Sequence, residues 1–176
     1  MLAEKNTNNT IQSINRMTDF SSRDFRNAMG LFATGVVVIS NHQDGGTHAM
    51  TANAFMSGSL EPPLIVVSVD HKARMHKRLE ESELFGVSLL SAGQQPTSNH
   101  FAGKVSPDHQ PVFVDVMGVP VLGDSPLTVV AELRHTYPCG DHTLFVGEVK
   151  ALECHDEQCR PLLFHKGRYA DLYPLN

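Results

Sequence analysis

Small and polar residues are concentrated in an extended segment that stands directly before the most apolar strand-like run of the chain. Residues 48–70 read HAMTANAFMSGSLEPPLIVVSVD and include Thr51, Ala52, Asn53 and Ala54. Because small side chains leave backbone N–H and C=O groups uncovered, such a strand can offer those groups to a large flat ligand. The alternatives are a loose surface loop or a glycine- and serine-rich edge strand.

Two other segments contain residue types that suit an anion such as a phosphate group. Residues 70–76 (DHKARMH) follow a predicted strand and open a predicted helix, so helix N–H groups and Arg74 can face an anion. The acidic first residue of this segment would repel a phosphate, so we assign it only a backbone contact. Residues 101–104 (FAGK) offer Gly103 for close backbone approach and a lysine for charge. The alternative for each segment is a solvated helix start.

The cysteines raise the question of a metal site, and their spacing argues against one. Cys154, His155 and Cys159 form a CHxxxC pattern, with His165 beyond it. This spacing is not a usual zinc pattern, and a second close cysteine pair is missing. We therefore expect no metal and interpret residues 153–161 (ECHDEQCRP) as an exposed hairpin.

The composition limits the classes of protein to which this chain can belong. Its 176 residues fit one domain, predicted over residues 20–176 after a flexible polar tail at residues 1–19. The formal net charge is -5 and no basic block occurs, so binding to nucleic acid through its phosphates is not expected. The apolar runs are too short to span a membrane, and the N-terminal segment has no apolar signal core. The 3 cysteines give no secreted-type disulfide framework, so we expect a cytoplasmic protein.

The first predicted element is an amphipathic helix that begins at Ser21 or Ser22 and ends at Thr34-Gly35, where glycine suits a left-handed cap. Its apolar stripe consists of Phe25, Ala28, Met29 and Phe32.

The remaining pattern favours a β-rich fold. Strands are predicted at residues 36–40, 47–56, 64–69, 85–90, 127–135, 143–153 and 162–169, helices at 72–83 and 94–102, a hairpin turn at 44–46 and a loop-rich segment at 103–124. Because the strands are mostly consecutive, we expect a closed or nearly closed antiparallel barrel with helices at its ends, and not a doubly wound parallel sheet. Neither GxGxxG nor GxxxxGK occurs, so no Rossmann fingerprint or P-loop is present.

Several separated segments, taken in their order, resemble one known family. They are FRNAMGLFATGVVVIS, a glycine turn, MTANAFMSGSLEPPLIVVSVD, FGVSLL, Gln95 ahead of HFAG, GDHTLFVGEV and PLLFHKGRY. This order resembles the short-chain flavin reductases, the small components of two-component flavin-dependent monooxygenases. RMH, FGVSLL and the terminal PLN look most like the styrene monooxygenase type. The resemblance implies an all-β-dominated split β-barrel with Greek-key topology and a few helices, found as a homodimer.

The resemblance also implies a function. Such a protein is an NAD(P)H:flavin oxidoreductase that passes a hydride to free FAD or FMN and supplies reduced flavin to a partner monooxygenase. The choice between FAD and FMN stays open, with the nearer match leaning toward FAD. NADH is expected over NADPH because no dedicated arginine for a 2′-phosphate stands out. The alternatives are a non-catalytic flavin-binding module, or another split-barrel enzyme such as a pyridoxamine-phosphate oxidase or a haem-degrading protein. GDHTLFVGEV favours the reductase.

Specific residues take roles through the same resemblance. The isoalloxazine ring of the flavin is expected against Thr34, Val36 and residues 51–54. His142 follows the turn at Gly140 and Asp141, and the resemblance implies that it positions the nicotinamide rather than acting as a general base. The alternative is a turn histidine at a strand end. The predicted flavin-binding residues are Thr34, Val36, Met50, Thr51, Ala52, Asn53, Ala54, Ser57, Val69, Asp70, Arg74, His76, Phe101, Ala102, Gly103 and Lys104.

Overall fold

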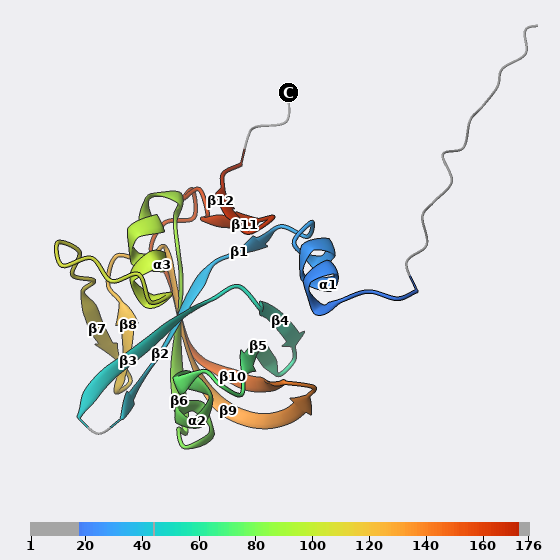
Figure 1. The fold of residues 1–176 in the computed structure, drawn as a ribbon. Helices are drawn as coiled ribbons and strands as arrows, with labels where there is room; N and C mark the ends of the chain where they lie inside the picture. Colours follow the sequence, from blue (N-terminus) through green and yellow to red (C-terminus); the bar gives the residue numbers. More distant parts are fainter. Residues whose placement is uncertain (1–17, 44, 173–176) are drawn as a thin grey trace, which may run out of the picture.

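An antiparallel sheet of 7 strands forms most of the molecule (Figure 1). The computed structural model describes residues 18–43 and 45–172, so most of the predicted tail and the terminal PLN lie outside the described residues. The strand order is β3-β2-β6-β9-β10-β5-β4, and every pairing is antiparallel, as predicted. The strands are β2 (Val37–Gln43), β3 (Gly46–Ala52), β4 (Phe55–Leu60), β5 (Pro63–Asp70), β6 (Leu84–Leu89), β9 (Leu127–Cys139) and β10 (His142–Cys154).

The two edge strands of this sheet are neighbours in the sequence. β3 ends at Ala52 and β4 begins at Phe55, so only Asn53 and Ala54 join them. Three consecutive Cα–Cα steps reach at most about 11 Å, so the sheet must curl until its edges approach each other. Residues 51–54, where the edges meet, are termed the barrel seam. The small residues noted in the sequence therefore lie where the barrel is split.

Two small sheets complete the fold, and both contain a hairpin that the sequence prediction missed. One is β7 (Phe113–Val116) with β8 (Val119–Leu122), and the other joins β1 (Thr34–Gly35), β11 (Leu163–His165) and β12 (Arg168–Ala170). The first turns at Met117 and Gly118, and the second at Lys166 and Gly167, all with positive φ. Tight hairpin turns of this kind usually carry Asn-Gly or Asp-Gly, so methionine and lysine gave no turn signal.

The helices are short, and the first one ends earlier than predicted. They are α1 (Ser22–Met29), α2 (Arg74–Glu80) and α3 (Gln95–Phe101), with a 3₁₀ turn, η1 (Ala92–Gln94), before α3. Ser21 caps α1 as predicted, because its Oγ accepts from the N–H of Asp24 at 3.2 Å. Hydrogen bonds from Ser21 in turn lower the pKa of Asp24. The predicted end at Thr34-Gly35 is wrong, since these residues form β1 and pair with β11.

The apolar stripe of α1 is exposed rather than buried. Phe25, Met29 and Phe32 are 56, 53 and 72% exposed, and α1 buries none of its residues. The helix lies at the periphery of the barrel in Figure 1. The apolar stripe has the spacing of a helix that packs on a hydrophobic core, but in this single chain no core covers it.

The main hydrophobic core fills the barrel. Ile65, Val67 and Val69 of β5 point inward and pack with Phe85 and Phe145. Because successive side chains of a strand point to opposite faces, the residues between them in β5 face outward. A smaller cluster lies near the ends of β2 and β6 and consists of Val36, Val38, Leu90, Leu122 and Leu162.

Gly147 of β10 lies against the core in a space too small for a side chain. A Cβ added there would lie 2.7 Å from Cζ of Phe85 and 2.9 Å from Cβ of Ala131. Both neighbours are held in packed strands, so we expect Gly147→Ala to lower the free energy of unfolding by about 1–3 kcal/mol through overpacking. Urea denaturation measures this loss. Gly93→Ala is a matched control, because nothing lies within 4 Å of its added Cβ, and an equal loss in both variants would contradict the packing explanation.

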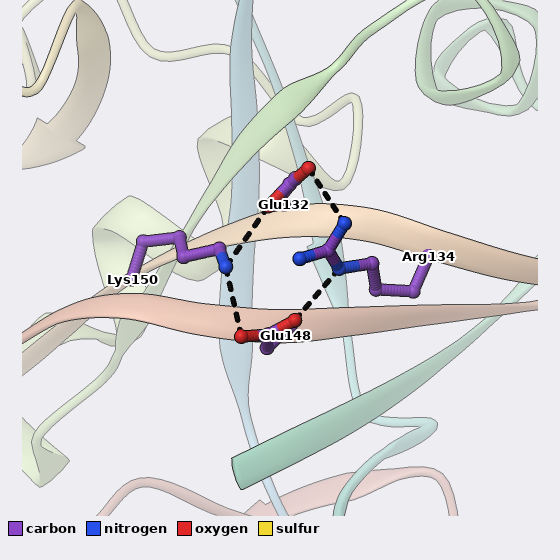
Figure 2. Close-up of polar contacts among 4 residues, drawn as sticks. All are labelled: Glu132, Arg134, Glu148 and Lys150. Atoms are coloured by element: carbon purple, nitrogen blue, oxygen red, sulfur yellow. Dashed lines mark hydrogen bonds and ion pairs between the residues drawn. The ribbon is translucent and has the colours of Figure 1, made fainter. Parts of the chain in front are cut away.

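Charged side chains form a closed network across β9 and β10 (Figure 2). Glu132 and Glu148 stand directly opposite each other in the strand register, an arrangement that is unfavourable alone. Arg134 donates to both carboxylates, at 2.9 and 2.7 Å, and Lys150 lies 3.0 and 2.8 Å from them. Hydrogen bonds from Lys150 and Arg134 lower the pKa of Glu148, while those to Glu148 and Glu132 raise the pKa of Lys150. The bases therefore offset the repulsion between the acids.

Candidate functional site

A pocket of about 130 Å³ lies beside the barrel seam. It is enclosed by the seam, by α3 and by the hairpin of β11 and β12. We term it the seam pocket. Its lining residues are Val36, Thr51, Ala52, Asn53, Ser98, Ala102, Phe164 and Tyr169. These side chains are small, aromatic or uncharged, which suits the face and edge of a neutral ring system.

Hydrogen bonds fix the polar side chains around the seam pocket. Thr51 Oγ1 donates to the backbone carbonyl of Ser98 at 2.7 Å, and Asn53 Nδ2 donates to Thr34 Oγ1 at 3.2 Å. The Tyr169 hydroxyl donates to Asn99 Oδ1 at 3.1 Å and lies 2.9 Å from Ser98 Oγ. These contacts tie β3, α3 and β12 together. Because β3 is an edge strand of its sheet, one side of its backbone has no neighbouring strand among the described residues.

The seam pocket gathers one group of the predicted residues and adds others that the sequence prediction missed. Ser98, Phe164 and Tyr169 had no predicted role. PLLFHKGRY contributed to the resemblance, but its aromatic residues reach the seam only because β11 and β12 form a hairpin. The predicted residues found in the pocket are Val36, Thr51, Ala52, Asn53 and Ala102, and Thr34 joins them through its hydrogen bond with Asn53.

A second group of predicted residues lies where β5 ends and β10 begins. His142, the first residue of β10, pairs with Asp70, the last residue of β5. Its Nδ1 lies 2.7 Å from Oδ1 of Asp141, and this hydrogen bond lowers the pKa of Asp141. Arg74 is exposed at the start of α2. We term this region the β10 end.

The seam and the β10 end are connected through β4 and β5. The carbonyl of Ala54 accepts from the N–H of Ser68 at 3.0 Å, and Ser68 pairs with Leu144 of β10. With a spacing of about 4.8 Å between strands and about 3.4 Å per residue, Ala54 and His142 lie about 12 Å apart along the sheet. A ligand at the seam must therefore extend along the sheet to approach His142.

The structure separates the two predicted phosphate anchors. Arg74 begins α2, and Lys104 follows α3 beside Gly103, whose φ is +87°. Figure 1 shows α2 and α3 at opposite ends of the barrel. Burial lowers the pKa of His48 on β3, and the charges of Arg78 and Arg74 lower it further. Arg74 and Arg78 of α2 therefore act on a side chain of β3.

Other predicted residues have side chains that are used within the protein. Met50 and Val69 pack against the main core, and Phe101 packs against the smaller cluster. The ring of His76 binds Thr143 at 2.8 Å. Ser57 is exposed on β4. For Val69, which is 1% exposed, a ligand contact would have to involve the backbone.

A second hollow, of about 450 Å³, adjoins the seam pocket through Tyr169. It is larger than the seam pocket and lies beside the start of α3. Its lining residues are Ala92, Gln95, Leu162, Tyr169, Ala170 and Asp171. Tyr169 contributes to the lining of both hollows, so the two lie beside the same side chain.

The cysteine-containing segment does not form the predicted hairpin. β10 ends at Cys154, and the chain then continues through a loop to an isolated bridge between Pro161 and Ser91. All of the cysteines are free. Burial raises the pKa of Cys159, and the neighbouring Asp156 and Cys154 raise it further. Within residues 18–43 and 45–172, no cluster of His, Cys, Asp and Glu has the arrangement of a metal site.

No helix within residues 18–43 and 45–172 is long and apolar enough to cross a membrane.

Together, the fold and the seam pocket define a split-barrel protein suited to a planar heteroaromatic ligand. The Flavin reductase like domain family matches residues 29–173. An NADH-dependent flavin reductase from Rhodococcus sp is 38% identical over 150 residues, which cover 84% of each chain. The flavin reductase PheA2 is 41% identical with a TM-score of 0.83, over 88% of this chain and 100% of that one. The styrene monooxygenase flavin reductase from Pseudomonas putida S12 is 38% identical with a TM-score of 0.79, over 87% and 99%. This chain belongs to the flavin reductase-like family.

Proposed function

We propose that this chain is an NADH-dependent flavin reductase that supplies reduced flavin to a monooxygenase. The observation that carries this proposal is the family match over residues 29–173. The edge-strand seam with its uncharged pocket supports it. The names of the relatives favour this function over a passive flavin-binding module or another split-barrel oxidase.

The chemistry divides between the flavin and the protein. Flavin accepts the hydride, and this chain holds and orients the two reactants. The apolar walls of Val36 and Phe164 suit a flat ring, and the uncovered edge of β3 offers N–H donors toward its polar rim. Fixed N–H donors stabilise negative charge that develops on a reduced ring. Orientation of the donor and acceptor supplies much of the rate of hydride transfer.

Both FAD and FMN fit the proposal. One relative is named an NADH-dependent FMN reductase, from Streptomyces nodosus subsp. asukaensis, at 32% identity. Another is named an NADH-dependent FAD reductase, from Streptomyces globisporus, at 38% identity. Steady-state assays with NADH or NADPH against FAD, FMN and riboflavin test the function directly. Oxidation of NADH should depend on added flavin, and a rate unaffected by flavin would contradict the proposal.

The separation of Arg74 and Lys104 gives a sharper test of phosphate binding. Because α2 and α3 lie at opposite ends of the barrel, only one of these cations should hold the phosphate of a flavin in one chain. We expect either Arg74→Ala or Lys104→Ala to weaken FMN binding about tenfold, about 1.4 kcal/mol, without changing riboflavin binding. Titration of flavin fluorescence measures both affinities. Arg168→Ala, an exposed cation on β12, is the control. Equal FMN and riboflavin affinities in the unmodified protein would remove both residues from the site.

A homodimer is also part of the proposal, and an apolar surface supports it. Leu64 and Val66 alternate with the inward residues of β5, so they face outward, and Met56, Leu144 and Val146, the last only 9% exposed, lie on the neighbouring strands. We term these five residues the outer sheet face. Met56 of this face is 59% exposed, and the stripe of α1 adds further exposed apolar side chains that a second copy could cover.

Solution measurements test the dimer. We expect light scattering to give twice the mass of one chain, and Val66→Glu to give a monomer, because a charge would be buried on the outer sheet face. Glu157→Ala, an exposed loop change, is the control and should leave the mass unchanged. A monomeric mass for the unmodified protein would contradict the proposal. A cytoplasmic location, expected from the unpaired cysteines, remains a prediction.

A further inference from the structure

One buried hydroxyl lies within hydrogen-bond distance of two imidazole rings at the β10 end. Oγ1 of Thr143 is 2.8 Å from Nε2 of His76 and 3.2 Å from Nε2 of His71. Thr143 is 6% exposed and follows His142 directly in β10. The two rings meet edge to face, with centroids 4.9 Å apart. His71 precedes α2 and His76 lies in its first turn. Thr143 therefore links the residues on both sides of the helix start to β10, the strand that carries His142.

The donors and acceptors in this cluster can be assigned. A threonine hydroxyl has one proton, so it donates to one ring and accepts from the other when both rings are neutral. Nδ1 of His76 lies 3.5 Å from Oε2 of Glu80, and an ionised carboxylate can only accept. We assign the ring proton of His76 to Nδ1, on the side of this carboxylate, and this assignment leaves Nε2 to accept from Thr143. His71 then donates its Nε2–H to Thr143.

The resulting chain runs in one direction, from His71 through Thr143 and His76 toward Glu80. Two further contacts hold the start of α2 against β10. The backbone N–H of His71 donates to the carbonyl of Asp141 at 3.0 Å. The ring of His76 packs edge-on against Phe145, with centroids 5.3 Å apart. The start of α2 is thus bound to the two residues that flank His142, Asp141 and Thr143.

The alternation of β10 decides how Thr143 can act. Successive side chains in a strand point to opposite faces, so Thr143 points away from the face that His142 presents. Thr143 therefore cannot contact a nicotinamide beside His142. We propose that Thr143 is a positioning residue, which fixes the β10 end through the two imidazoles and so holds His142 in place for hydride transfer. This inference rests on the proposed function, because it takes His142 as the nicotinamide-positioning residue.

The test compares Thr143→Val, which keeps the shape and removes the hydroxyl, with Thr143→Ser, which keeps the hydroxyl. We expect the valine variant to slow the hydride step in stopped-flow traces about tenfold, because small misplacements at a reacting centre are costly. The serine variant should retain nearly the full rate. Flavin affinity at the seam pocket should stay nearly unchanged in both. Thr136→Val, in the exposed second half of β9 and opposite Phe145, is the control for a substitution in the same pair of strands.

A second measurement tests the hydrogen bonds from His71 through Thr143 to His76 independently of catalysis. With ¹⁵N-labelled histidine, NMR should show a protonated Nε2 on His71 and an unprotonated Nε2 on His76. The same state at both nitrogens would overturn the assigned direction.

The kinetic outcomes separate this inference from the proposed function. An unmodified protein without flavin-dependent NADH oxidation would contradict the function itself. An active protein whose valine variant keeps the normal hydride rate would overturn the role of Thr143. Equal losses in the valine and serine variants, or a parallel loss of flavin affinity, would also overturn it, because each would indicate general damage to the fold.

Discussion

Phenylalanine in place of Ala102 should strongly weaken flavin binding while leaving the barrel folded. Ala102 lines the seam pocket but is itself exposed after the end of α3, so no core contact is lost. The added ring would occupy most of a pocket of about 130 Å³ and cover the edge of β3. We expect flavin affinity to fall at least about 100-fold, about 2.8 kcal/mol, and NADH oxidation to fall with it.

Flavin fluorescence titration measures the loss at Ala102, and thermal unfolding confirms that the variant is folded. Ala102→Ser is the matched control, because serine adds one oxygen and leaves the pocket open. Normal flavin affinity in the phenylalanine variant would place the ring away from the seam pocket. In that case the uncovered backbone of residues 51–54 would not be part of the flavin-binding site.

His142→Ala should slow flavin reduction far more than it weakens flavin binding. His142 lies about 12 Å from Ala54 along the sheet, beyond the residues that line the seam pocket. Its contribution is therefore expected where the nicotinamide approaches. Loss of an orienting contact can cost up to about 100-fold in rate, so we expect a decrease of about 10- to 100-fold in the hydride step.

Stopped-flow absorbance at saturating flavin separates the hydride step of His142→Ala from binding. Flavin affinity should change less than about threefold, which is below 1 kcal/mol. His155→Ala is the control, since His155 is an exposed histidine in the loop after β10. An unchanged hydride step in His142→Ala would reject the positioning role and leave His142 as a turn histidine at a strand end.

Much of the fold was predictable because its signals are local. The capped start of α1 at Ser21 was visible in residue types, and so was the turn at Gly45 between β2 and β3. The strands β5 and β10 were also predicted, at residues 64–69 and 143–153, from their apolar and β-branched residues. The hairpins at Met117 and Lys166 were missed because their turns carry residues that rarely adopt positive φ. The exposure of the α1 stripe was missed because the spacing of apolar residues shows which side of a helix is apolar. It does not show which part of the protein, if any, covers that side.

The site was predictable in part, for a similar reason. Ala52 and Asn53 were identified by their small size beside an apolar strand, and the structure places them at the seam. Ser98 and Tyr169 were missed because they reach the pocket from α3 and β12, which are far from the seam in sequence. The grouping of Arg74 with Lys104 as anchors could not be checked from sequence, because only the barrel shows that their helices lie at opposite ends.

The charge network in Figure 2 affects how two copies of this chain could approach each other. Each chain carries a formal charge of -5, so long-range repulsion between copies is expected. Glu148 pairs with Leu64, which places the network beside the outer sheet face, and its two acids and two bases sum to zero. The four charges of this network therefore add no net repulsion of their own. Association through this face should strengthen only modestly with added salt, in contrast to a contact flanked by uncompensated carboxylates.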